Sequence, residues 1–161
     1  MVDGANVAQP DRTQVMIRLL GLMILALCAS ISSAALAWQE PQRGSATRAA
    51  LMDSIRPHVE WELGQPVVFV VDELRVAGDV GLAFLSPQRP QAMPINLQST
   101  PGMRRGSLEP DQMDGVAVAV LYRKLRNTWV AVHHSIGATD LWIASDEYCQ
   151  EYRPVLSDFC R

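Results

Sequence analysis

The residues of this chain that are best suited to chemistry lie close together. His133 and His134 are adjacent, Ser135 follows them directly, and Asp140 comes five residues later. A serine, a histidine and an aspartate form a nucleophilic triad when their side chains meet in space, and imidazoles are common ligands of zinc. The third interpretation is that this stretch is the end of a β-strand, and the surrounding sequence bears on all three.

The sequence context argues against both kinds of active centre. Ser135 has no Gly-x-Ser-x-Gly frame, in which a strand-to-helix turn presents a nucleophilic serine. The sequence also lacks the His-x-x-x-His and Cys-x-x-Cys spacings of zinc sites. We therefore interpret the histidines as the end of a strand and Gly137–Asp140 as a turn. In this turn Asp140 accepts hydrogen bonds from nearby backbone N–H groups. His133, His134 and Asp140 are kept only as weak catalytic candidates.

Strand geometry separates the two histidines. Successive side chains of a strand point to opposite faces of the sheet, so His133 and His134 do not chelate one metal unless a bulge twists the strand. A two-residue turn at Arg126–Asn127 pairs Val120 with His133. This register places His133 on the face of Trp129 and His134 on the other face. A shift of one residue reverses the assignment, so which histidine is buried stays open.

The remaining polar residues predict no cofactor and no metal. The sequence has no phosphate-binding loop, dinucleotide fingerprint or zinc signature. Glu60 and Glu62 stand two apart on a predicted helix, so they do not share a face. With 14 basic and 17 acidic residues the net charge is −3, and Lys124 is the only lysine. Because phosphate backbones need a concentrated positive surface, we expect no nucleic-acid partner.

Residues 1–37 have the features of a secretory signal peptide. Arg18 precedes the apolar run Leu19–Ala29, small residues follow, and Ala35-Leu36-Ala37 matches a cleavage site. The apolar run is shorter than the roughly 20 residues of a membrane-spanning helix, and Met16 is an alternative start. We therefore expect an exported domain, periplasmic or secreted from a Gram-negative bacterium, with no membrane attachment after cleavage.

Cys149 and Cys160 remain after this cleavage. An even number of cysteines in an exported chain predicts a disulfide bond, which here closes a loop of 12 residues. In the chain-entropy model, such a loop stabilises the fold by about 3 kcal/mol. The alternative is two free thiols, which holds if the chain is not exported.

Hydrophobic periodicity divides the first half of the exported chain into elements. After a flexible leader at 38–46, apolar residues at every fourth position predict a helix over 47–63, which Pro57 should kink or restart. The hydrophobic period changes to two at 66–76, and it is also two at 80–85. These two runs predict a β-hairpin.

The second half opens with a segment of a different composition. Residues 86–110 contain half of the prolines and predict a long loop that is functional or disordered. The alternating runs 116–125 and 129–136 predict a second hairpin, and 141–143 a short edge strand. The order of these runs therefore places the loop between two hairpins.

The elements together predict the fold class. A short helix begins at Ser145 and ends at Pro154. Residues 47–161 are therefore predicted to form a single α+β domain. In it, one long N-terminal helix packs on an antiparallel sheet of two hairpins, and a short C-terminal helix follows. Cystatin-like and NTF2-like folds share this order of elements, so we use both names by analogy alone.

A series of short segments carries a resemblance. The chain contains Ile55-Arg56-Pro57, Val59-Glu60, Glu62-Leu63-Gly64-Gln65-Pro66-Val67, Phe69-Val70-Val71, Leu74-Arg75-Val76, Gly78-Asp79 and His134-Ser135-Ile136-Gly137-Ala138-Thr139-Asp140. These resemble a group of small exported bacterial proteins of uncharacterised function, over most of residues 47–142. In that group Gly-Asp is usually followed by Trp-Ala-Phe, whereas here Val80-Gly81-Leu82 precedes Ala83-Phe84. The resemblance implies one exported domain and no activity.

These observations favour a non-catalytic protein. A small, acidic, disulfide-linked domain without a catalytic constellation fits a binding or inhibitory module, or an envelope accessory protein that acts only in assembly. Loop 86–110 and the aromatic residues Trp142, Tyr148 and Tyr152 could form its contact surface. An envelope or cell-wall protein is the expected partner, and insertion of the loop into the partner's cleft is the expected mechanism.

The alternative is a small-ligand binder or a hydrolase-like enzyme. It would use His133 or His134 as an acid–base group in a pocket between helix and sheet. The two hypotheses predict different structures. A deep pocket beside one histidine favours the enzyme, whereas a filled core with both histidines at the rim favours the binding module.

Overall fold

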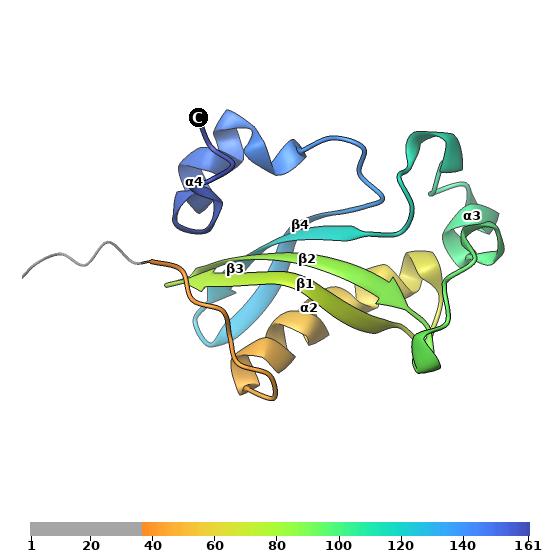
Figure 1. The fold of residues 1–161 in the computed structure, drawn as a ribbon, viewed down its shortest axis with the longest axis horizontal. Coiled ribbons are helices and arrows are strands. Elements are labelled where there is room, and N and C mark those ends of the chain that lie inside the picture. The colour runs from red at the N-terminus through yellow and green to blue at the C-terminus, as the bar shows by residue number, and fades with distance from the viewer. Residues whose placement is uncertain (1–36) are drawn as a thin grey trace, which may run out of the picture. The chain divides into compact units, whose positions relative to one another are not determined.

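An antiparallel sheet of four strands lies at the centre of the structure, a computed structural model that describes residues 37–161. The predicted signal segment up to residue 36, including Met16, lies outside the described residues. The strands follow one another across the sheet in chain order (Figure 1): β1 (Val68–Ala77), β2 (Val80–Gln88), β3 (Val118–Leu125) and β4 (Thr128–Ile136). The α+β class is confirmed.

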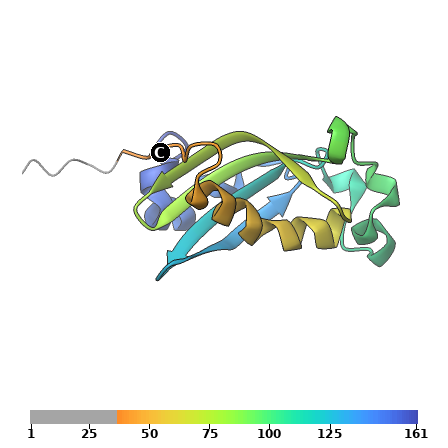
Figure 2. The ribbon, with the colours of Figure 1, turned by 90° about the horizontal axis from the view of Figure 1, so that it is seen from below.

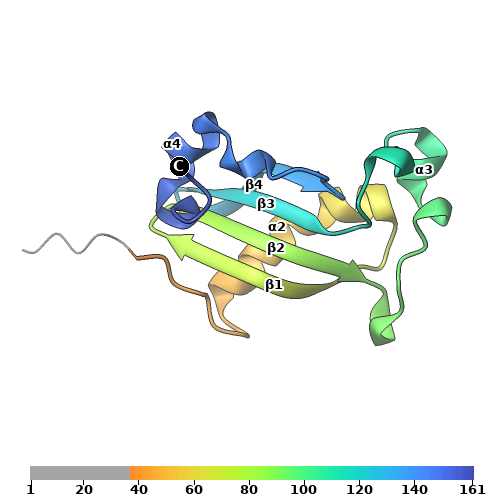
Figure 3. The same cartoon turned by 45° about the horizontal axis from the view of Figure 1, so that its top comes forward.

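Helices cover both faces of this sheet. α2 (Ala46–Leu63) crosses one face, and α4 (Asp146–Leu156) lies over one end of the other (Figures 2 and 3). Alternation along each strand supplies the two apolar layers. The α2 layer includes Leu51, Ile55, Val59, Leu63, Leu74, Leu85, Val120 and Tyr122. The α4 layer includes Ala77, Val80, Leu82, Leu121, Ile143, Tyr152, Val155 and Leu156.

α2 begins and continues differently from the prediction. Ser45 is its N-cap and accepts a hydrogen bond from the N–H of Arg48. The helix runs through Pro57 to Leu63 without a restart. Pro57 lies on the exposed side, where water can bond the carbonyl that the missing N–H leaves free. Gly64, with a φ of 81°, ends the helix, because glycine adopts positive φ without a steric cost.

Two bulges interrupt the alternation of the sheet. In β1, Asp72 is the extra residue between the pairs Val71–Leu85 and Glu73–Phe84. In β4, Val132 is the extra residue, because the register with β3 shifts between residues 121 and 122. A bulge moves all later side chains of its strand to the other face. The bulge in β4 therefore decides where the two histidines point.

The proline-rich segment is ordered rather than a featureless loop. We call residues 89–112 the arm, which connects β2 to the approach of β3. Short helical turns make up much of it: η2 (Pro90–Ala92), η3 (Leu97–Ser99), α3 (Pro101–Arg105) and η4 (Pro110–Gln112). Three of these turns begin with a proline. Proline favours this position because its φ is preset and its missing N–H would be unpaired there anyway.

The C-terminal segment departs from two predictions. Residues predicted as an edge strand form the 3₁₀ turn η5 (Trp142–Ala144) instead. The last helix passes Pro154 and ends at Leu156, with a non-helical residue at Tyr152 that accommodates the proline ring. Within the described part of the chain, the search for a helix both long and apolar enough to span a bilayer finds none.

Candidate functional site

The bulge at Val132 reverses the predicted placement of the histidines. Up to the bulge, the predicted register is correct, since Leu125 pairs with Thr128. Beyond it, His134 rather than His133 pairs with Val120. His134 therefore shares the α2 face with Trp129. The prediction that placed His133 on that face is wrong, because the bulge shifts the strand by one residue.

Each histidine contacts a different helix. The ring of His134 lies 4.9 Å from the ring of His58 on α2, and the ring of His133 lies 4.8 Å from that of Tyr148 on α4. α4 covers the second face at this point, so His133 is half-buried, whereas His134 on the α2 face is exposed. Opposite faces prevent the two imidazoles from acting together on one atom of a substrate.

The histidines lie apart from the pockets described here. Among four pockets within residues 37–161, none is lined by a histidine. The same residues contain no group of three or more His, Cys, Asp or Glu side chains that could hold a metal ion. Asp140 lines a different hollow of about 220 Å³, between Phe84, Ala119 and Trp142. The sequence-predicted candidates are thus dispersed over two faces and a loop.

His134 supplies a pH dependence of stability. Its pKa is lowered, first by burial, then by the repulsion of His58 and of His133, while Glu62 opposes the shift. As the pH falls, the unfolded chain therefore binds the proton before the folded protein does. The stability that the neutral imidazole contributes is complete above about pH 6.5 and is lost as the pH falls from there through the lowered pKa of the folded protein. Urea unfolding between pH 8 and pH 5 should show a decline that is smaller in His134→Gln. An equal decline in both proteins would contradict this assignment.

The arm is fixed to α2 at its start by Arg89. The guanidinium donates hydrogen bonds to the carbonyl oxygens of Leu63, at 2.6 Å, Pro66, at 3.0 Å, and Gly64. Two of these three belong to the end of α2, where carbonyls have no partner within the helix. One arginine thus caps the helix and positions the residues that follow it.

These residues form an exposed tip, which we define as Pro90–Pro94. The N–H of Arg89 donates to the carbonyl of Met93 at 2.8 Å and closes the turn. Gln91 and Ala92 have φ angles of 63° and 59°, a left-handed conformation that side chains disfavour. Met93 is 54% exposed. The tip is therefore a strained, exposed turn with an apolar side chain, fixed from below by Arg89.

The second half of the arm is fixed to the last turn of α2. Arg105 donates to the carbonyl of Trp61 at 2.8 Å and to Glu62 at 3.1 Å, and Ser107 donates to Glu62 at 2.5 Å. Gly102 fits closely here, because a β-carbon would lie 2.7 Å from the side chain of Leu108. Both ends of the segment that carries the tip are therefore fixed to one helix.

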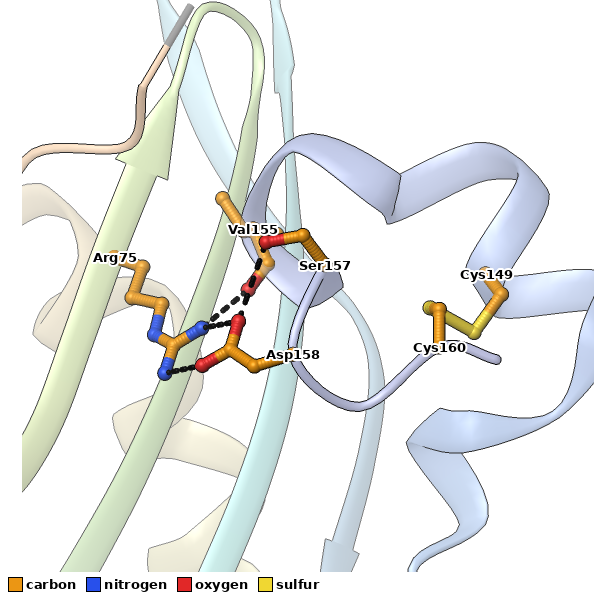
Figure 4. The surroundings of a disulfide bond; sticks show 6 residues. All are labelled: Arg75, Cys149, Val155, Ser157, Asp158 and Cys160. Carbon is orange, nitrogen blue, oxygen red and sulfur yellow. Dashed lines mark hydrogen bonds and ion pairs between the residues drawn. A yellow bond between two sulfur atoms is a disulfide. The ribbon is translucent and has the colours of Figure 1, made fainter.

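A second rigid feature closes the C-terminus (Figure 4). Arg75, 5% exposed, donates two hydrogen bonds of 2.7 Å to the carboxylate of Asp158 and one of 3.1 Å to the carbonyl of Val155. The rings of Trp38 and Phe159 lie 4.6 and 5.2 Å from its guanidinium. We call this cluster the clasp. Arg75 also forms an ion pair with Glu73 on its own strand.

The clasp lies beside the predicted disulfide. The sulfurs of Cys149 and Cys160 are 2.03 Å apart, so the predicted pair lies at bonding distance. The hydrogen bond from Arg75 lowers the pKa of Asp158 to about 2, which keeps its carboxylate charged. The disulfide thus joins α4 to the residues that follow it, and the ion pair of Asp158 with Arg75 attaches this segment to β1.

Comparison with protein-family models, with curated proteins and with solved structures gives no significant match. The interpretation of the site therefore depends on its own geometry. The residues that matter most in it, Arg89 and Met93, were not singled out by the sequence analysis as an anchor and a contact. The proline content of 86–110 was the one signal that pointed to their segment.

Proposed function

We propose that this protein is an exported, non-catalytic binding module that inhibits or assists a partner protein of the bacterial envelope. The observation that carries the proposal is the tip Pro90–Pro94, exposed, strained and anchored by Arg89. The mechanism is steric: the tip inserts into a cleft of the partner. The predicted signal peptide and the cysteine pair support export, and the cystatin-like or NTF2-like architecture remains an analogy within this proposal.

The geometry of the tip suits recognition rather than catalysis. Unfavourable backbone angles persist only where the surroundings enforce them, and such positions cluster at functional sites. A loop that is already held in its bound shape loses little conformational entropy when it binds, which strengthens association. Methionine adapts to irregular apolar pockets. The placement of His133 and His134 on opposite faces of the sheet weakens the alternative of a ligand binder or hydrolase.

Changing Met93 should disrupt partner binding without unfolding the domain. The full chain, Met93→Glu and the control Leu125→Glu would be affinity-purified from cells, and the bound proteins quantified by mass spectrometry. Leu125, 57% exposed against 54% for Met93, matches it in exposure but lies at the turn of the second hairpin. If Met93 is a binding hot spot worth about 2 kcal/mol, its loss weakens binding about thirtyfold.

The outcomes separate clearly. Recovery of one partner with the wild type and with Leu125→Glu, but not with Met93→Glu, supports the proposal. The same set of bound proteins in all three samples contradicts it. Circular dichroism of the purified variants checks that each remains folded, since both substituted side chains are exposed.

A further inference from the structure

We propose that the outer edge of β1, residues 68–72, binds an extended acidic segment of the partner as an added strand. The inference deepens the proposed binding role and rests on it, but it uses a surface other than the tip. A strand that joins a sheet edge gains main-chain hydrogen bonds, and pockets for its side chains provide specificity. The structure offers both at this edge.

β1 is an edge strand that already accepts a strand at one end. It stands first in the sheet, with β2 as its neighbour on one side only. On the other side, Gln39 and Val76 exchange two backbone hydrogen bonds, of 2.8 and 2.9 Å. The chain leaves the edge at Pro41, which has no N–H to continue the ladder. Among residues 37–161 no other bridge reaches this side of β1.

The backbone groups of the free part of β1 point outward at regular intervals. Because Val76 bonds outward to Gln39, alternation directs every second residue away from β2. The bulge at Asp72 shifts this alternation by one, so the outward residues are Phe69 and Val71. Pro87 of β2 lies opposite Phe69 and has no N–H to donate. This agrees with Phe69 making no backbone hydrogen bonds to β2. An added strand finds donors and acceptors at both positions.

The side chains of this edge are apolar and accessible. Val68 and Val70 are 42% and 43% exposed. Exposed β-branched residues on a free edge favour pairing with another chain, and edges that should stay unpaired usually carry charges or prolines. Within residues 68–72 the single charge is Asp72, at the bulge, and its carboxylate accepts a hydrogen bond from Ser86 of β2. Val68–Val71 carry neither a charge nor a proline, so this part of the edge can pair with another strand.

A groove of about 470 Å³ runs between this edge and the first half of α2. Its apolar part is formed by Ala49, Met52, Phe69 and Val71, so it can take the side chains that an added strand directs towards α2. The edge therefore has a specificity pocket beside its hydrogen-bonding groups.

The charge of the groove selects an acidic segment. It is lined by Arg43 and Arg48 and by no carboxylate. Arg48 also bonds Glu40, at 3.1 Å, and the carbonyl of Pro41, at 3.0 Å. Arg43 is exposed and makes no ion pair within the described residues. The first turn of α2 contains no acidic residue, so the positive end of the helix dipole adds to this charge.

Synthetic peptides test the proposal directly. The probe is a fluorescent peptide of sequence Thr-Val-Thr-Val-Glu-Val, titrated into the protein expressed from its complete reading frame. We expect saturable binding by fluorescence anisotropy, with amide shifts at residues 68–72 in NMR spectra. Arg43→Glu should weaken binding about tenfold, the scale expected for one charge-assisted hydrogen bond. The exposed arginine change Arg153→Glu on α4 is the matched control.

Two altered peptides test the strand and the charge separately. Replacing Glu by Lys should weaken binding to the wild type, and Arg43→Glu should then strengthen rather than weaken binding of the Lys peptide. Methylating the amide nitrogens of alternate residues removes the hydrogen-bond donors along one side of the peptide. Of the two peptides, methylated at odd or at even positions, one should lose binding and the other should keep it. Met93→Glu should leave peptide binding unchanged, which distinguishes failure of this proposal from failure of the tip.

Three results would overturn the proposal. The first is no binding of the acidic peptide. The second is equal affinity for the Glu and Lys peptides, or equal affinity of both methylated forms. The third is concentration-dependent dimerisation in sedimentation experiments with amide protection at 68–72, which would assign the edge to a second copy of this chain.

Discussion

Replacing Arg75 with methionine is expected to lower the free energy of unfolding by about 3 kcal/mol. The residue is buried, and its guanidinium bonds Asp158, Glu73 and the carbonyl of Val155. Hydrogen bonds of a charged donor contribute more than neutral ones, and the change also removes the packing of the guanidinium against Trp38 and Phe159. Chemical denaturation, followed by tryptophan fluorescence, measures the change.

Arg123 provides the control for this experiment. It pairs with Asp79 and Glu151, and its own side chain is 23% exposed against 6% for Arg75, so water screens its pairs more strongly. Exposed pairs contribute about 1 kcal/mol or less, and Arg123→Met should therefore cost clearly less than Arg75→Met. Equal costs for the two arginines would show that the clasp has no special role.

The clasp also sets the behaviour of the protein in acid. The pKa of Asp158 falls from its ordinary value of 3.8 to about 2. A carboxylate with a lowered pKa contributes its full stabilisation above the unfolded value, and the contribution is lost as the pH falls through the folded value. The stabilisation from the ion pair should therefore be complete above about pH 4 and be lost as the pH falls from about 4 to about 2.

Removing the disulfide is the second change with a large expected effect. Cys149→Ala together with Cys160→Ala should cost about 3 kcal/mol, because the unfolded chain regains the freedom of a 12-residue loop. Differential scanning calorimetry of the oxidised protein and of the double variant gives the difference. A melting temperature unchanged within one degree would contradict the expectation.

The disulfide and the clasp should not act independently. Asp158 and Phe159 contact Arg75 and directly precede Cys160, so either change frees the same tail. Neighbouring substitutions in one network are rarely additive. We expect Arg75→Met to cost less in the double-cysteine variant than in the wild type, and a double-mutant cycle measures that difference.

The sequence predicted the parts of the fold that repeat regularly. Apolar residues at every fourth position located α2, and alternation located all four strands, because burial on one or two faces dictates those periods. The bulge at Val132 was not predictable, since no glycine or proline marks it. One unmarked residue was enough to exchange the faces of His133 and His134.

The candidate site was harder to predict than the fold. Proline content distinguished 86–110 but was interpreted as absence of structure, although Pro90, Pro101 and Pro110 each begin a helical turn. Arg89 reaches carbonyls more than twenty residues earlier in the chain. Such long-range hydrogen bonds leave no local pattern, so only the folded structure shows which arginine is an anchor.

The dependence of one apolar layer on α4 has a consequence for biogenesis. The first layer is covered by α2 and by residues of the arm, whereas Leu82 and Leu121 gain their cover from the C-terminal segment that carries Cys160. A nascent chain kept from oxidants would leave these residues without a firmly attached cover, a target for chaperones and proteases. Yield in an oxidising compartment should therefore exceed yield in a reducing one.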